Sequence, residues 1–154
     1  MTKWILRGVF DGIQFGIDRA ATVALMPYLP GLAKYQLRCC FTGAINTLAR
    51  LRKIGQIEDD CCPGCQSCPE TWTHIADACP AYDAIRYRDF APTEWHEMPA
   101  SLRLRGLVQA SLADSWHKDD IRGLAANVQY TLLDFLAHRA TLLPSHLHPQ
   151  PRWS

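Results

Sequence analysis

The residues best suited to chemistry in this chain are three cysteines and a histidine at metal-ligand spacing. Cys62, Cys65, His74 and Cys79 form a C-x2-C-x8-H-x4-C array. A tetrahedral Zn²⁺ ion takes four sulfur and nitrogen donors of this kind, and a CxxC turn supplies two of them from one loop. Because protein would fill all four positions and leave none for water or substrate, the array predicts one structural zinc ion.

The spacing of the first two ligands depends on the residues between them. Pro63 and Gly64 provide one fixed φ and one permissive residue, which suits a tight turn with both sulfurs pointing inward. Cys61 or Cys68 could instead replace one member of this pair, but either exchange removes the Pro-Gly turn from between the two sulfurs. We therefore prefer Cys62 and Cys65, and leave the exchange open.

The second pair of ligands requires a helix that loosens. Pro69 suits the first position of a short helix through His74, with Glu70 in its first turn. On a regular α-helix His74 and Cys79 would point about 140° apart, and Pro80 disfavours helical geometry at the residue before it. We expect the helix to loosen here so that both ligands can converge.

Two other interpretations of the cysteines remain open. Free cysteines are often simply buried, and a disulfide framework would also use closely spaced cysteines. Seven cysteines is an odd number, however, and five of them lie within residues 61–79, which favours an intracellular metal site. Charged residues interrupt the first twenty positions, and the uncharged stretch 20–33 is too short to cross a bilayer. We expect an intracellular protein, nuclear or cytoplasmic, with no membrane association.

Basic charge is concentrated in one part of the chain. The net charge is +1, but no acidic residue occurs between Arg19 and Ile57. Apolar residues at three- and four-residue steps predict one amphipathic helix over 31–54, and Gly43 within it suggests close packing against another element. A second face of that helix is polar, with Lys34, Arg38, Thr42, Asn46, Arg50 and Lys53. This stripe could follow phosphates, or it could simply be a solvated helix face.

Two further residues complete the candidate nucleic-acid interface. Arg52 adds a cation to the end of the predicted helix, and Trp72 lies two residues before His74. The indole could stack on a base or could shield the metal. The candidate nucleic-acid-binding set is Lys34, Arg38, Arg50, Arg52, Lys53 and Trp72.

The chain lacks the residue spacing of two zinc-dependent catalytic motifs. A zinc deaminase needs H-x-E before a P-C-x-x-C segment, whereas here His96 is followed directly by Glu97 and comes after the cysteines. A zincin helix, H-E-x-x-H, would need histidine where Ala100 stands. We therefore expect no enzymatic activity and no small-molecule substrate.

The remaining segments also predict helices. We expect a helix from Pro80 through Phe90, a loop marked by Pro92 and Pro99, a short helix at 102–112 and a long one at 119–141. The fold class is mainly α, a small helical domain with an embedded CCHC zinc module. The predicted organisation is a partly helical segment 1–30, the basic helix and zinc module 31–90, a helical region 91–143, and a flexible Pro/His tail 144–154.

Segments 38–44, 51–55, 62–65 and 70–82, above all the pattern E-T-x-x-H-x4-C-P, resemble a known family. They are similar to the zinc-binding region C-terminal to the reverse transcriptase, and often the RNase H, of non-LTR retrotransposons. The resemblance spans about residues 31–90. It implies a CCHC zinc site, with Cys62, Cys65, His74 and Cys79 as ligands, that helps to handle element RNA or target DNA.

The chain also departs from that family. It contains neither a reverse transcriptase Y-x-D-D motif nor an RNase H carboxylate set, so it would be a detached terminal fragment, a domesticated gene or a remnant. The gap before His74 is longer than that of retroviral zinc knuckles. The expected function is binding of RNA or single-stranded DNA without catalysis, and the alternative is a zinc-stabilised protein-interaction module.

Overall fold

The computed structural model describes residues 16–110 and 118–147, and within these ranges the chain is mainly helical, as predicted. Two isolated antiparallel bridges, Ile17 with Gln109 and Cys61 with Pro69, are the extended pairings there, and these ranges contain no strand. The elements are α1 (Arg19–Val23), 3-10 helix η3 (Met26–Tyr28), α2 (Gly31–Thr42), α3 (Leu48–Lys53), π-helix η4 (His74–Ala78), 3-10 helix η5 (Pro80–Tyr82), α4 (Asp83–Arg86), α5 (Pro92–Glu97), α6 (Ala100–Arg105), α8 (Lys118–Leu142) and 3-10 helix η6 (Ser145–Leu147).

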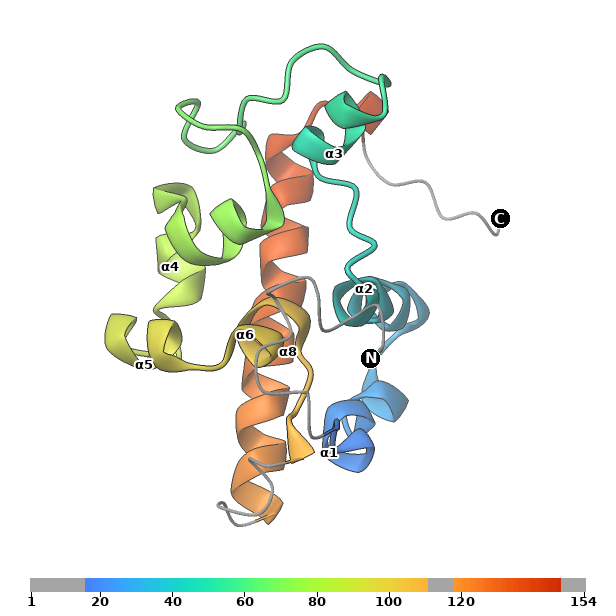
Figure 1. The fold of residues 1–154 in the computed structure, drawn as a ribbon, viewed down its shortest axis with the longest axis vertical. Helices are drawn as coiled ribbons and strands as arrows, with labels where there is room; N and C mark the ends of the chain where they lie inside the picture. The colour runs from blue at the N-terminus through green and yellow to red at the C-terminus, as the bar shows by residue number, and fades with distance from the viewer. Residues whose placement is uncertain (1–15, 111–117, 148–154) are drawn as a thin grey trace.

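Helix α8 is the central element of the fold. It contacts α1, α2, α4, α6 and η4, with α1 and α2 on one side of it and α4 on the other (Figure 1). The long helix predicted at 119–141 is confirmed, and it has an apolar face in which Ile121, Val128, Leu132 and Phe135 are fully buried. None of the described helices has the length and hydropathy needed to cross a membrane. The helix therefore serves as the support against which the shorter segments pack.

An aromatic cluster joins the segment around the cysteines to α8. The ring of Phe135 makes edge contacts with Trp72, Tyr82 and Trp95, at centroid distances of 6.3, 5.8 and 5.8 Å. Edge-to-face pairs of this kind add about 0.5–1.5 kcal/mol each beyond the area that they bury. The three partners come from different elements, so one side chain of α8 holds several short segments together.

The prediction of a single helix over residues 31–54 is wrong. Helix α2 ends at Thr42, because Gly43 adopts a left-handed φ of 71° and its N–H donates to the carbonyl oxygens of Cys39 and Cys40. A side chain at Gly43 would clash with the guanidinium of Arg105, which confirms the predicted close packing. The chain then turns and begins α3, where the Thr47 hydroxyl accepts from the Arg50 N–H at 3.3 Å.

The helix boundaries between residues 80 and 112 also differ from prediction. Pro92 begins α5 rather than marking a loop, and the Glu94 carboxylate accepts from the Ala91 N–H at 3.2 Å. Helix α6 ends at Arg105 because Gly106 adopts a φ of 70°, so the helix predicted at 102–112 is shorter and earlier. Of the predicted tail, Ser145–Leu147 form a 3-10 turn, and residues 148–154 lie outside the described residues.

Candidate metal centre

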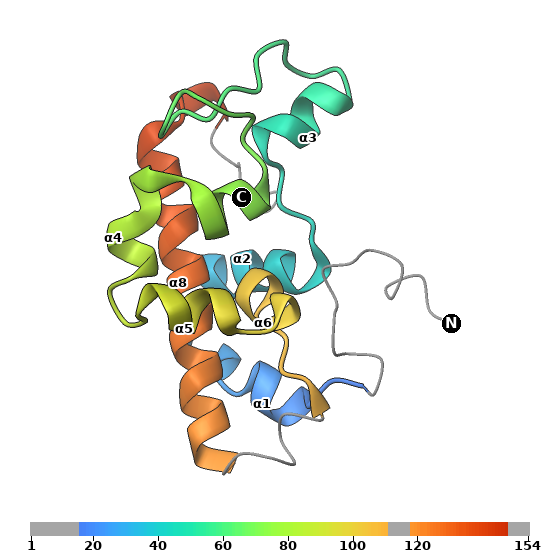
Figure 2. The same cartoon turned by 60° about the vertical axis from the view of Figure 1, so that its left-hand side comes forward.

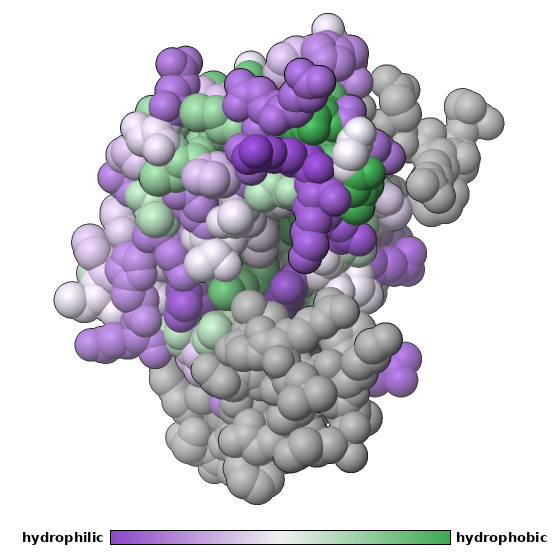
Figure 3. Space-filling model, turned by 45° about the horizontal axis from the view of Figure 1, so that its top comes forward, coloured by the Kyte–Doolittle hydropathy of each residue, from purple (hydrophilic) through white to green (hydrophobic). Residues whose placement is uncertain are grey.

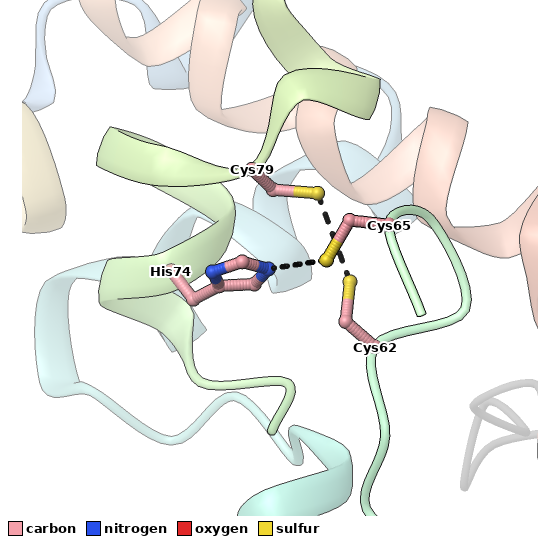
Figure 4. A group of neighbouring side chains, drawn as sticks. All are labelled: Cys62, Cys65, His74 and Cys79. Atoms are coloured by element: carbon pink, nitrogen blue, oxygen red, sulfur yellow. Dashed lines mark hydrogen bonds between the residues drawn. The ribbon is translucent and has the colours of Figure 1, made fainter. Parts of the chain in front are cut away.

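The four predicted ligands converge on one point (Figure 4). The ligand atoms of Cys62, Cys65, His74 and Cys79 all lie within 4.8 Å of one another. The Cys62 and Cys79 sulfurs are 3.7 Å apart, and the Cys65 sulfur is 3.3 Å from His74 Nε2. Tetrahedral zinc would separate two sulfurs by about 3.8 Å and a sulfur from a nitrogen by about 3.5 Å. The group therefore has the donors and the spacing to hold a metal ion.

The CxxC turn forms as predicted, and its glycine has a steric reason to be there. The Gln66 N–H donates to the Cys62 carbonyl at 2.8 Å and closes the turn. A Cβ at Gly64 would lie 2.7 Å from the Ala81 Cβ and 3.3 Å from the Cys79 sulfur. The absence of a side chain at Gly64 thus allows the turn to approach the second pair of ligands.

The two additional cysteines in this segment lie outside the group of four. Cys61 pairs with Pro69 in a β-bridge, and the Cys68 carbonyl accepts from the Cys62 N–H at 2.7 Å. Their backbones thus close the loop that carries the first two ligands, while their thiols are not part of the group within 4.8 Å. The fold therefore brings Cys62 and Cys65, rather than Cys61 or Cys68, together with His74 and Cys79.

A π-helix brings His74 and Cys79 onto one face. The Cys79 N–H donates to the His74 carbonyl at 2.7 Å, a bond over five residues that widens the turn. The expected loosening of the helix is confirmed. The helical segment does not begin at Pro69, however, because the Thr71 hydroxyl accepts from the His74 N–H at 3.0 Å and helical geometry starts at Trp72.

A buried arginine satisfies the carbonyl groups that end the π-helix. The guanidinium of Arg86 donates from Nε to the Ala76 carbonyl at 2.6 Å, and from Nη2 to those of Ile75 at 2.8 Å and Cys79 at 3.1 Å. Its side chain is 1% exposed, and Asp83 is its ion-pair partner. The sequence showed Arg86 only as one polar residue in a predicted helix and gave no sign of its burial.

Asp77 fixes the outer side of the same turn. Its carboxylate accepts from Arg103 Nε at 2.8 Å and Nη2 at 3.1 Å, and from the Trp95 indole N–H at 3.2 Å. The same indole N–H lies 3.0 Å from the Ala76 carbonyl. Residues from α5 and α6 therefore hold the turn that carries two of the four ligands.

The prediction that Glu70 lies in the first turn of a helix is wrong. Glu70 instead forms a buried ion pair with Arg139 of α8. The carboxylate is fully buried and accepts from Arg139 Nη2 at 2.8 Å. It also accepts from the Leu48 N–H at 2.9 Å, and the Glu70 carbonyl accepts from the Ala49 N–H at 3.1 Å. Glu70 thus connects the segment that carries the four candidate ligands, residues 61–79 and here called the metal loop, to α8 and to the first turn of α3.

The thiols of Cys65 and Cys79 differ in pKa. A hydrogen bond from the Ser67 backbone, assisted by His74, lowers the pKa of Cys65 to about 6. Burial raises the pKa of Cys79 to about 12. In the absence of a cation, Cys65 is therefore a thiolate at neutral pH while Cys79 keeps its proton, which a bound metal must displace.

The predicted cationic stripe is divided by the break at Gly43. Arg38 is exposed on α2 and Lys34 is half-buried there, whereas Arg50, Arg52 and Lys53 are exposed in the last turn of α3. Arg52 Nη1 lies 3.3 Å from Asp60, which partly neutralises its charge. The two groups of cations belong to separate helices rather than to one continuous face.

Trp72 is a member of the candidate nucleic-acid-binding set, but its burial excludes it from a binding surface. Its side chain is 9% exposed, and its indole N–H donates to the Leu104 carbonyl at 2.7 Å. A base cannot stack on a ring packed in this way against Phe135. The prediction of a stacking surface at Trp72 is wrong because the ring is needed in the aromatic core.

Comparisons with protein-family models, with curated proteins and with solved structures gave no match for this chain.

Proposed function

We propose that this chain is a structural zinc protein that binds RNA or single-stranded DNA through the exposed cations of α3. The observation that carries the proposal is the direct attachment of α3 to the metal loop through Glu70, which accepts from Leu48 and Ala49 of α3. In this proposal the metal has no catalytic task. It fixes the loop that positions the helix.

The donor set supports zinc in particular. Three thiolates and one imidazole are soft and borderline ligands, which suit zinc better than magnesium or calcium. Four protein donors leave no open position, as in structural rather than catalytic zinc sites. The ligand-atom separations lie near those of a tetrahedral zinc complex.

The placement of charge supports a nucleic-acid partner. Helix α3 carries Arg50, Arg52 and Lys53 in its last turn, all exposed. The end of the molecule that carries α3 is mostly hydrophilic, with apolar side chains among the polar ones (Figure 3). Arg38 of α2 adds a fourth exposed cation. Cations grouped in this way interact with phosphates irrespective of sequence.

The family resemblance supports the same partner. The pattern E-T-x-x-H-x4-C-P contains two of the four proposed ligands, and the retrotransposon region that it resembles handles nucleic acid. We extend the proposal to a retrotransposon-related origin for residues 31–90. The pattern E-T-x-x-H-x4-C-P includes none of the α3 cations, so their proposed contact with phosphates is argued from their exposure and from the attachment of α3 to Glu70.

Salt-dependent binding to a single-stranded oligonucleotide tests the proposal. Affinity should fall steeply with ionic strength, and a variant with Arg50→Ala and Lys53→Ala should bind more weakly with a smaller salt slope. The matched control is Arg19→Ala with Arg122→Ala. It removes the same charge from exposed positions on α1 and α8, at the opposite end of the molecule (Figure 2). Equal losses in both variants, or no salt dependence, would contradict a specific interface at α3.

A protein-interaction module is the second candidate function, and several exposed apolar side chains favour it. Val23, Tyr28, Leu32 and Tyr35, from α1, η3 and α2, are exposed apolar or aromatic side chains, and Tyr28 is 83% exposed. Such groups often mark protein contacts. Sedimentation of the wild type against Tyr28→Ser with Leu32→Ser checks for self-association. A monomeric wild type at all concentrations would rule out a contact between copies of this chain.

A further inference from the structure

A cavity of about 240 Å³ lies between α2, α3 and the C-terminal part of α8. Its apolar lining includes Ile45, Leu51 and Leu136, and its polar lining includes Gln36 and Gln56. Cavities for drug-sized ligands usually measure roughly 300–1,000 Å³. This one is suited to a single ring system with polar groups at its edge.

Arg139 gives the cavity a charged lining residue. Its side chain is 7% exposed and lines the cavity. Nε donates to Glu70, and Nη2 donates to Glu70 and to the Asn46 carbonyl at 3.0 Å. Within residues 16–110 and 118–147, Nη1 has no hydrogen-bond partner. Nη1 is therefore the guanidinium nitrogen that would donate to a bound ligand.

These features together match a nucleobase. A base has two apolar faces that fit between aliphatic side chains, and carbonyl oxygens or ring nitrogens that can accept from Arg139 Nη1. The amides of Gln36 and Gln56 each offer a donor and an acceptor to the rest of its edge. Arg50 Nη1 lies 3.4 Å from the carbonyl oxygen of Gly43, the residue before Ala44 in the cavity lining, so one cation for an adjoining phosphate lies near the cavity.

We propose that this cavity receives one unstacked base of a single-stranded nucleic acid, an inference that rests on the proposed nucleic-acid function. The charged contacts of α3 would provide affinity that does not depend on the base. The cavity would add a contact that exists only when a base is present.

The test compares two oligonucleotides with the same backbone. One carries thymine at every position and the other is abasic, and both are roughly 12 nucleotides long, within the usual range of single-strand site sizes. By fluorescence anisotropy, zinc-loaded wild type should prefer the thymine strand by roughly fivefold or more. Ala44→Leu, which places extra atoms on a residue that lines the cavity, should abolish this preference without changing the affinity for the abasic strand.

The control variant is Ala84→Leu, at an exposed position on α4 on the other side of α8, and it should behave as wild type (Figure 1). Equal binding of both strands by wild type would overturn the cavity proposal and leave the charged interface intact. Binding of neither strand would overturn both proposals. Titration with thymidine monophosphate, followed by NMR of the Gln36 and Gln56 side-chain amides, separates the two possible sources of a base. Shifts with the mononucleotide but no strand binding would also overturn both proposals, and would assign the cavity to a free nucleotide.

Discussion

Glu70 and Arg139 form a buried ion pair between the metal loop and α8, with Nε 3.0 Å from Oε2 and Nη2 2.8 Å from Oε1. The carboxylate lies four residues before the ligand His74, and its partner lies near the end of α8. Removing one member of such a pair leaves the other charge buried without a counter-ion.

Arg139→Met should therefore lower the free energy of unfolding by about 3–5 kcal/mol, because Glu70 would stay buried and unpaired. Urea denaturation measures this loss. The matched control is Arg88→Met, which breaks an exposed pair with Asp134 and should change stability by about 0–1 kcal/mol. Similar losses in both variants would contradict a special contribution from the buried pair.

The metal centre predicts a defined stoichiometry. Protein purified without chelator should contain one zinc ion per chain by elemental analysis, and His74→Ala or Cys79→Ala should abolish this content because each removes one of four ligands. Cys68→Ser should retain the zinc, since its thiol lies outside the group within 4.8 Å. Loss of zinc from Cys68→Ser together with retention in Cys79→Ala would reassign the ligands.

Zinc affinity should decrease as the pH is lowered from 8 to 7. Burial raises the pKa of Cys79 to about 12, so this thiol is protonated across that range and binding must release its proton. Cys65, with a pKa of about 6, is already ionised there and releases little. Each released proton weakens binding about tenfold per pH unit. Calorimetry in buffers of different ionisation enthalpy counts the protons, and a count of zero would contradict this description.

Gly64→Ala should weaken zinc binding by roughly 10- to 100-fold, the usual effect of disturbing groups that orient metal ligands. The new methyl group would lie 2.7 Å from the Ala81 Cβ and 3.3 Å from the Cys79 sulfur, so the CxxC turn would have to move away. Gly123→Ala is the matched control, since nothing lies within 4 Å of its added methyl group. It should leave zinc affinity unchanged, whereas equal effects would point to a general loss of stability. Competition with a chromogenic zinc chelator measures both.

The sequence was sufficient to predict the ligand set because that prediction depends on local spacing. The turn at Gly64 and the widened turn between His74 and Cys79 follow from proline, glycine and helical geometry over a few residues. Long amphipathic periodicity likewise predicted α8. The fold class could be inferred in the same way, since no stretch alternated at period two.

The residues that support the site could not be predicted, because their environment is set by tertiary packing. Arg86, Glu70 and Trp72 are polar or amphipathic in sequence, yet each is buried, and the partners of Glu70 and Trp72 are distant in the chain. The break between α2 and α3 was missed for a related reason. A glycine inside a periodic pattern can continue a helix or end it, and here the guanidinium of Arg105 lies where a side chain at Gly43 would have to be.

Arg86, which supports the π-helix, lies outside the segment that carries the ligands, so the fold of that segment depends on the rest of the chain. Several of the side chains that hold the ligand segment 61–79 in shape come from outside that segment, namely Arg86, Trp95, Arg103 and Arg139. We therefore expect that this segment does not fold independently as a zinc finger. A synthetic peptide of residues 61–80 should bind zinc through its thiols, yet its circular dichroism should lack the helical signal of the intact chain, and fusing it to another protein should not transfer a folded domain.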